Sequence, residues 1–341
     1  MKYKAFLDFR IIEVKKMIKN SFEFCENILP EVSRSFALTI PMLDDELYRP
    51  VLITYLMDRL LDNIEDEING IELERKKNLM DMMVEIFNPF LDTSISLIKE
   101  IKDSSKLIED DSLHKLSNEV DTIQKAFKNL DINLQIISYK WLKEMNQGMK
   151  KYLSFEVKTF KDLDEYCYYV AGTVGGFLTD TMIYLSDIDI KKQKQLKSNY
   201  INAGLFLQKI NLVRDIRKDL KKRKKHFWPM EELELEPDLI LKSYYKEKAM
   251  GGLHLMIEDI KIHIAGLISY LEAIPSKFKG YRNFFCVNNA LGLVTLELME
   301  DNEKLFYGKK DIKVKKIDFL KILSLPEKTF MKKSRSYLSE V

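Results

Sequence analysis

The chain is long, nearly balanced in charge and poor in residues that break helices. It has 341 residues, of which 55 are Lys or Arg and 53 are Asp or Glu, so the formal net charge is only +2. That balance argues against a nucleic-acid protein held by bulk positive charge. A hydrophobic share of 46% is too high for a disordered chain. With 12 glycines and 8 prolines, the chain lacks the many turns of an all-β protein, so we expect long helices.

The cysteines and the apolar runs indicate the compartment. Cys25, Cys167 and Cys286 are scattered and odd in number, which excludes a disulfide framework and suits a reducing environment. Charges interrupt every apolar stretch near the N-terminus, so no signal peptide is expected. No run of 18 apolar residues occurs, so no transmembrane helix is expected either. We expect a cytoplasmic protein that is soluble or peripherally associated with a membrane surface.

Helical periodicity recurs from one end of the chain to the other. The segments expected to be helical are 1–29, 44–67, 72–100, 106–153, 160–185, 193–222, 240–272 and 283–306. Pro30, Pro41 and Asn69-Gly70 are expected to end helices. The polar stretch 101–120 is expected to be a surface connection, and 309–341 is basic with a short apolar patch. No linker or repeat divides the chain, so we predict one all-α domain over 1–341.

Three carboxylates share one face of the predicted helix 44–67. Asp62, Glu65 and Asp66 stand at positions i, i+3 and i+4, and Arg59 and Tyr55 fall on the same side. Clustered carboxylates repel one another, so a sequence keeps them most readily where a cation binds. A solvated acidic face is the alternative for any single cluster of this kind.

A second polar stripe lies in the otherwise apolar helix 193–222. Gln208, Asn211, Asp215 and Asp219 follow at spacings of 3, 4 and 4, with Arg214 and Arg217 beside them. Two acidic faces directed at one cavity would suit Mg²⁺, which prefers oxygen ligands, keeps several waters and is commonly completed by substrate phosphates. Such an ion would make a diphosphate a better leaving group. Two stripes together weaken the solvated-face alternative.

Five stretches carry a resemblance to a known family. They are SRSFALTI at 33–40, YLMDRLLDNIEDE at 55–67, YCYYVAGTVGG at 166–176, GLFLQKINLVRDIRKD at 204–219 and HFWP at 226–229. A weaker sixth is NFFCVNNALGLVTL at 283–296. In this order and spacing the chain resembles the squalene/phytoene synthases, which are head-to-head prenyl transferases, and most closely the squalene synthases of the eukaryotic type.

The resemblance implies an all-α isoprenoid synthase fold with a deep cavity, two farnesyl diphosphates as substrates, Mg²⁺ and NADPH. Tyr166 matches the tyrosine proposed to assist the first half reaction, and Tyr55 and Arg59 match the helix of the first motif. The residues implied to bind metal are Asp62, Glu65, Asp66, Asn211, Asp215 and Asp219. The residues implied to contact diphosphate are Ser33, Arg34, Ser35, Arg59, Gln208, Arg214, Lys218 and Lys225. The expected prenyl pocket comprises Phe36, Leu38, Val170, Gly172, Gly175, Leu205, Phe285 and Cys286.

One position departs from the family pattern. The second motif usually reads D-x-x-E-D, but here Lys218 stands between Asp215 and Asp219 where the family has glutamate. A lysine could contact diphosphate as a point charge, or it could weaken one metal site. The number of bound Mg²⁺ ions is therefore open.

Several features have two interpretations. Gly172 and Gly175 could admit a prenyl chain or only tight helix packing, and Tyr166 could instead be a core tyrosine. The basic run 217–225 could be a solvated helix end, a lid over phosphate or a contact with anionic lipid. No G-x-G-x-x-G follows a strand pattern, so NADPH would bind outside a Rossmann fold.

The predicted function is that of a squalene synthase. The alternatives are a non-reductive head-to-head synthase, which makes dehydrosqualene, phytoene or presqualene diphosphate, and a non-catalytic helical protein that binds a lipid or a partner.

Overall fold

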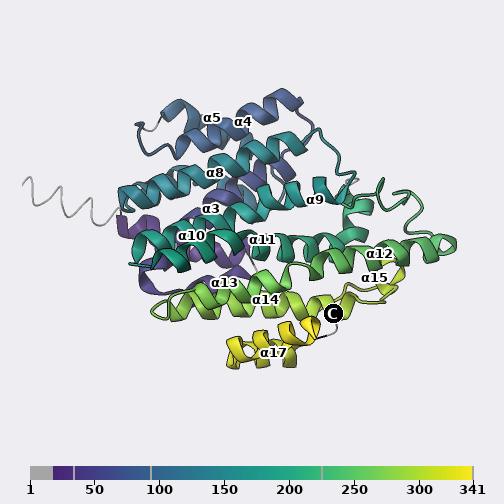
Figure 1. The fold of residues 1–341 in the computed structure, drawn as a ribbon. Coiled ribbons are helices and arrows are strands. Elements are labelled where there is room, and N and C mark those ends of the chain that lie inside the picture. Colours follow the sequence, from purple (N-terminus) through teal and green to yellow (C-terminus); the bar gives the residue numbers. More distant parts are fainter. Residues whose placement is uncertain (1–17, 34, 93, 224–225, 340–341) are drawn as a thin grey trace, which may run out of the picture. The chain divides into compact units, whose positions relative to one another are not determined.

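A computed structural model of the chain describes residues 18–33, 35–92, 94–223 and 226–339 (Figure 1). Every regular element within these ranges is helical, and none of them is a strand. The prediction of an all-α protein is therefore confirmed. The fold divides into two compact units, residues 1–153 and 154–341. That these act as one domain stays a prediction.

The first unit is organised around the long helix α3 (Asp45–Asp66). This helix confirms the expected helix 44–67, and Pro50 is tolerated near its start. The helices that pack against it are α4 (Leu73–Ile86), α6 (Asp111–Asn118), α7 (Val120–Lys128) and α8 (Ile132–Tyr152). Within this buried core the Thr54 hydroxyl donates to the Ser138 hydroxyl at 2.8 Å, which ties α3 to α8.

The prediction was wrong about how the segment 72–153 is divided. Residues 72–100 form α4 and then α5 (Ile95–Ser105), because Asn88-Pro89 interrupts the hydrogen-bond ladder. The supposed surface connection 101–120 contains α6, whose Leu116 is fully buried. The Asp110 side chain accepts the Ser112 and Leu113 amides and so begins a helix inside a stretch that is polar in sequence.

The region around Pro30 and Pro41 is also more helical than predicted. The chain is helical from residue 18, where the description begins, to residue 32, so Pro30 lies in the last turn rather than ending the helix. Pro30 is exposed, so the backbone group left without a partner there can bond to water. After it come α2 (Phe36–Thr39) and the short 3₁₀ helix η1 (Ile40–Met42), in which Pro41 lies in the first turn.

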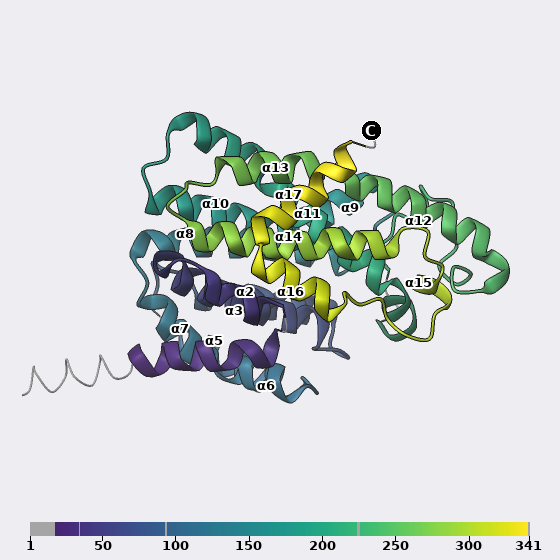
Figure 2. The same ribbon diagram turned by 90° about the horizontal axis from the view of Figure 1, so that it is seen from below.

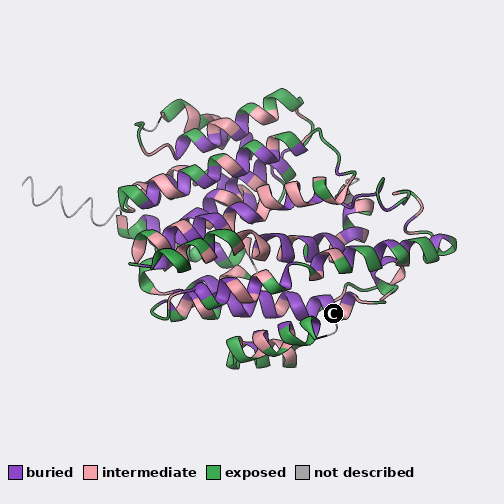
Figure 3. Cartoon of the chain, viewed as in Figure 1, coloured by how far each residue is buried: buried purple, intermediate pink, exposed green. Residues whose placement is uncertain are grey.

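The second unit is organised around α11 (Ile190–Lys218). The elements that pack against α11 are α9 (Phe160–Cys167), η2 (Tyr168–Gly172), α10 (Thr173–Leu185), α12 (Lys246–Lys261), α13 (Ile264–Ala273), α14 (Lys279–Met299) and α15 (Lys304–Tyr307). The helix α14 is buried along most of its length (Figure 3). Figure 2 shows α17 (Pro326–Leu338) lying across α14, and α16 (Lys316–Ser324) packs on both.

The predicted helices of this unit are largely confirmed, with two π-helical turns and two breaks. The segment 160–185 is continuous but contains η2, a wider π-helical turn of the kind often found at functional sites. The segment 193–222 corresponds to α11 and the π-helical turn η3 (Asp219–Arg223). The segment 240–272 is divided at Ile262-His263, and 283–306 is divided between α14 and α15.

No helix in the described ranges is both long enough and apolar enough to cross a lipid bilayer.

Candidate active site

The first acidic motif lies at the C-terminal end of α3, and a buried asparagine sets its orientation. The Asn63 amide donates to the Leu113 carbonyl at 3.2 Å and to the Ser117 hydroxyl at 3.1 Å, and both acceptors belong to α6. Asn63 is fully buried, so these bonds fix the rotation of α3 about its axis. Its neighbour Asp62 stays partly exposed, with 43% of its side chain accessible.

The three predicted carboxylates on α3 differ in exposure. Asp66 is exposed and Asp62 half-buried, whereas Glu65 is buried. The Lys76 ammonium donates to the backbone carbonyl of Glu65 at 2.6 Å and so satisfies an acceptor in the last turn of α3. Asp62 and Asp66, one turn apart, are therefore the more accessible oxygen ligands of this motif.

Ser33 and Phe36 lie near Tyr55 of α3. The Phe36 ring centroid is 5.3 Å from that of Tyr55. The Ser33 hydroxyl accepts the Phe36 amide at 3.1 Å. Arg59 donates to Asp62 at 3.0 Å. The structure thus brings predicted residues from two separate motifs into one cluster within the first unit.

Two other predicted residues near this segment are exposed to solvent. Ser35 is exposed and Leu38 is 51% exposed. Arg34, which was predicted to contact diphosphate, lies outside the described residues.

Burial and neighbouring charges perturb the ionisable groups of α3. Burial raises the pKa of Tyr55, although Ser33 and Arg59 partly oppose this effect, so the phenol stays protonated at neutral pH. Burial and the negative charge of Asp62 raise the pKa of Asp58 well above the ordinary value of an aspartate. Asp58 was not among the predicted site residues, although its position four residues before Asp62 places it on the acidic face.

The polar stripe of α11 changes from accessible to buried along the helix. Asn211 is exposed, Gln208 and Asp215 are half-buried and Asp219 is buried. Lys218, the residue that departs from the family pattern, is exposed. Lys225 lies outside the described residues.

Asp215 is held by the arginine that precedes it. Arg214 donates from Nε to Oδ1 at 3.0 Å and from Nη2 to Oδ2 at 2.6 Å. This bidentate bond raises the pKa of Arg214. Arg217 instead donates to Asp311 at 2.7 Å and to the Gly308 carbonyl, so it anchors the end of α11 to the segment 308–311.

Tyr166 is buried at the end of α9 and stacks on the HFWP segment. Its ring lies 4.4 Å from that of Phe227, with only 17° between the planes. The next residue, Trp228, is fully buried and donates to the Leu212 carbonyl of α11 at 3.1 Å. α9 and α11 belong to the same unit, so the HFWP segment joins the tyrosine to the helix that carries the second motif.

The predicted pocket residues of the second unit are mostly buried. Leu205, Phe285 and Cys286 are buried, and Val170 is half-buried. The Phe285 ring packs against Tyr270 and Phe330, with centroids 5.2 Å and 5.8 Å away. Burial raises the pKa of the Cys286 thiol to about 12, so it behaves as a small hydrophobic residue.

The two glycines have close neighbours, on α11 for Gly175 and within η2 for Gly172. A Cβ at Gly175 would lie 2.5 Å from the Tyr200 carbonyl oxygen of α11. A Cβ at Gly172 would lie 3.0 Å from the Tyr168 side chain. Tight helix packing therefore accounts for Gly175, and a role of either glycine in prenyl binding stays a prediction.

The donor set suits Mg²⁺ bound partly by substrate and water. The accessible donors are carboxylate and amide oxygens, which favour Mg²⁺ over zinc. In the part of the chain that the structure describes, no group of three or more His, Cys, Asp or Glu is arranged to hold a metal ion. Phosphate oxygens and water would thus have to complete any coordination shell. That α3 and α11 serve a single cavity stays a prediction.

Comparison with known proteins decides the family. The sequence model of the squalene/phytoene synthases matches residues 29–318, which include every motif described above. The chain belongs to the squalene/phytoene synthase family.

Squalene synthases are similar over most of the chain. Squalene synthase 1 of Arabidopsis thaliana is 30% identical over 292 residues, which is 84% of this chain and 67% of the plant protein. The squalene synthase of Rattus norvegicus is 28% identical over 297 residues, covering 86% of this chain and 67% of the rat protein. These matches identify the chain as an enzyme of the farnesyl-diphosphate farnesyltransferase class.

Solved structures of the family share the fold. A TcSQS structure in complex with the ligand BPH1237 superposes with a TM-score of 0.82 at 26% identity, covering 93% of this chain and 90% of that one. A dehydrosqualene synthase superposes with a TM-score of 0.59 at 18% identity, covering 96% of this chain and all of that one. The second likeness shows the fold alone.

Proposed function

We propose that this enzyme is a squalene synthase, which joins two farnesyl diphosphates through presqualene diphosphate and reduces that intermediate to squalene with NADPH. The observation that carries the proposal is the 30% identity to a plant squalene synthase over 84% of the chain. Two features within the units support it, namely the cluster of Phe36, Tyr55, Arg59 and Asp62 and the stacking of Tyr166 on Phe227.

The first half reaction breaks the C1–O bond of one farnesyl diphosphate, and diphosphate leaves with the bonding electrons. The C2–C3 double bond of the second substrate attacks the allylic cation, and loss of a proton closes a cyclopropane that keeps one diphosphate. Arg59 and Arg214, now paired with Asp62 and Asp215, would bind the departing oxygens with charge-assisted hydrogen bonds. Tyr166 is buried beside Phe227, so its ring and hydroxyl would face the cation away from bulk water.

Mg²⁺ would supply positive charge and NADPH would supply a hydride, which these side chains cannot provide. When bound, Mg²⁺ would neutralise the diphosphate charge, with Asp62 and Asp66 on α3 and Asp215 and Asn211 on α11 as the accessible ligands. NADPH would supply the hydride that ends the second half reaction, and its nicotinamide must bind outside a Rossmann fold, since the described residues contain no strand.

A non-reductive head-to-head synthase is the second candidate. The family model that matches the chain covers phytoene synthases as well as squalene synthases, and phytoene is a non-reductive product. Such an enzyme would share the first half reaction and would then either stop at presqualene diphosphate or quench the second cation without a hydride.

Product analysis separates the two candidates. The purified protein is incubated with farnesyl diphosphate and Mg²⁺, with and without NADPH, and the extracts are analysed by gas chromatography after phosphatase treatment. We expect presqualene alcohol without NADPH and squalene with it. A product that NADPH does not change would reject the reductive step. Absence of diphosphate release from C10, C15 and C20 diphosphates would reject the whole proposal.

A further inference from the structure

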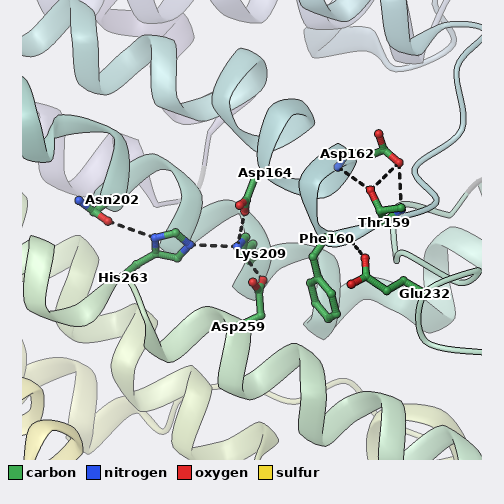
Figure 4. A network of polar contacts seen from close by, with 9 residues as sticks. All are labelled: Thr159, Phe160, Asp162, Asp164, Asn202, Lys209, Glu232, Asp259 and His263. Atoms are coloured by element: carbon green, nitrogen blue, oxygen red, sulfur yellow. Dashed lines mark hydrogen bonds and ion pairs between the residues drawn. The ribbon is translucent and has the colours of Figure 1, made fainter.

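A buried lysine lies at the meeting point of four elements of the second unit. Lys209 of α11 is fully buried, yet its motif neighbours Gln208 and Asn211 are accessible. Its ammonium nitrogen is 2.5 Å from Asp164 Oδ1 of α9 and 2.6 Å from Asp259 Oδ2 of α12. It is also 3.0 Å from Nε2 of His263, at the start of α13 (Figure 4).

The ammonium forms ion pairs with both carboxylates and a hydrogen bond with the imidazole. A lysine has three N–H donors and no acceptor, and three acceptors surround Lys209. Nε2 of His263 must therefore accept, so its proton is on Nδ1, which donates to the Asn202 amide oxygen at 3.1 Å. Burial and the charge of Lys209 lower the pKa of His263 to about 3, which agrees with a neutral ring.

Of the two carboxylates in this cluster, Asp164 is the one close in sequence to the candidate catalytic residue Tyr166. It stands two residues before Tyr166 in α9, a helix of only 8 residues that runs directly into the π-helical turn η2. α9 is the N-terminal part of this continuous helical segment, and its contacts with neighbouring elements hold that end in place. Its first turn is held by the Phe160 amide, which donates to Glu232 at 2.7 Å (Figure 4).

We infer that Lys209, acting through Asp164, is a positioning residue that holds Tyr166 at a fixed place relative to the polar stripe of α11. This inference rests on the proposed function only for the role of Tyr166. Asp164 holds the middle of α9, Phe227 covers one face of the tyrosine ring, and both contacts lead back to α11. A displacement of about 1 Å in such a group can lower a rate about 100-fold.

The cluster contains its own matched control. Asp259 binds the same ammonium as Asp164 but belongs to α12, which carries none of the predicted site residues. Its side chain is 14% exposed, against 43% for Asp164. Asp259→Ala should therefore destabilise the protein at least as much as Asp164→Ala. Substitution of Lys209 itself is a poorer test, because it would leave two carboxylates without a cation.

Steady-state kinetics with farnesyl diphosphate test the inference. We expect Asp164→Ala to lower kcat 10- to 100-fold with KM within about threefold of the wild type, and Asp259→Ala to keep kcat within about threefold. In a Tyr166→Phe background the further loss caused by Asp164→Ala should be less than about twofold, since both changes act on one group. Equal losses in the two backgrounds, or equal losses for the two alanine variants, would overturn the inference.

Hydrogen exchange tests whether Asp164 holds α9 in place, and this test does not depend on catalysis. In the full-length protein, Asp164→Ala should speed amide exchange of residues 160–168 at least about tenfold, whereas Asp259→Ala should leave that segment unchanged and speed exchange in α12. Unchanged exchange of 160–168 in Asp164→Ala would overturn the inference even if the wild type proved inactive. An inactive wild type with the expected exchange pattern would instead reject the proposed function.

Discussion

At the scale of single residues, each acidic motif contains an aspartate that an arginine already holds. Arg59 binds Asp62 three residues later on α3, and Arg214 binds its neighbour Asp215 on α11. Both aspartates keep about two-fifths of their side chains accessible, so solvent screens these ion pairs and they add little to stability. Under the proposed function, these carboxylate and guanidinium groups would exchange partners when a magnesium diphosphate binds.

Removal of the charge of Asp62 should therefore affect catalysis far more than folding. We expect Asp62→Asn to lower kcat by at least about 100-fold, because even loss of a residue behind a metal ligand costs about 10- to 100-fold. The melting temperature should change by less than about 3 °C. Asp45→Asn, in the exposed first turn of the same helix, is the control and should keep wild-type kinetics. Retention of a tenth or more of kcat by Asp62→Asn would exclude Asp62 as a ligand.

His263 should make stability depend on pH. Its folded-state pKa of about 3 lies below the ordinary 6.5, so on acidification the unfolded chain takes up a proton before the folded chain does. Stability from this group is complete above pH 6.5 and is lost as pH falls toward 3. Between pH 7 and pH 5 the loss is about 2 kcal/mol.

His263→Gln isolates this contribution, because a glutamine can still accept from Lys209 and donate to Asn202. Urea unfolding at both pH values should show that the wild type loses about 2 kcal/mol more than the variant between pH 7 and pH 5. Parallel losses in the two proteins would show that His263 is protonated in the folded state.

At the scale of helices, glycines set the close crossing of α11 with η2 and α10. A Cβ at Gly204 would lie 2.5 Å from the Gly172 nitrogen and 2.6 Å from the Ala171 carbonyl carbon, which are rigid backbone atoms. The sequence pattern singled out Gly172 and Gly175 but not Gly204, because a lone glycine in an apolar run looks the same whether it is packed or open.

Gly204→Ala should force α11 away from η2 and lower the free energy of unfolding by about 1–3 kcal/mol. Gly251→Ala is the matched control, since Gly251 is exposed within α12 and a Cβ there meets nothing within 4 Å. This control should gain about 0.5–1 kcal/mol from helix propensity. Urea unfolding measures both, and a Gly204→Ala variant as stable as the wild type would refute the close crossing.

At the scale of the whole molecule, the net charge is nearly balanced, but one stretch of the chain is strongly basic. Seven of the nine residues in 217–225 are Lys or Arg although the net charge is +2. Lys218 and Lys221 are exposed. Each basic side chain near an anionic surface contributes about 1 kcal/mol of attraction. Peripheral binding to anionic lipid would suit an enzyme with a hydrocarbon product.

Sedimentation with vesicles tests this prediction. Vesicles with about 30% anionic lipid should retain at least about tenfold more protein than neutral vesicles in low salt, and about 0.5 M salt should release it, because salt screens charge. The double variant Lys218→Glu Lys221→Glu should lose most of the binding. Equal binding to neutral and anionic vesicles would contradict an electrostatic origin.

The sequence by itself determined the helical class, the family and the two polar stripes. Periodicity and residue spacing are local properties, so they predicted α3 and α11 to within a few residues. Local pattern also led to errors at Pro30 and in 101–120. Within 101–120, burial of Leu116 and capping by Asp110 outweigh the polar composition.

Only the tertiary structure decided which residues of a motif are accessible and what holds them. It showed Glu65 and Asp219 buried beside accessible Asp62 and Asp215, and it revealed Asp58 as a further carboxyl group. It also joined Lys209 to carboxylates 45 residues before it and 50 residues after it. Such contacts depend on how helices distant in sequence pack together, and the spacing of residues along one helix carries no information about that.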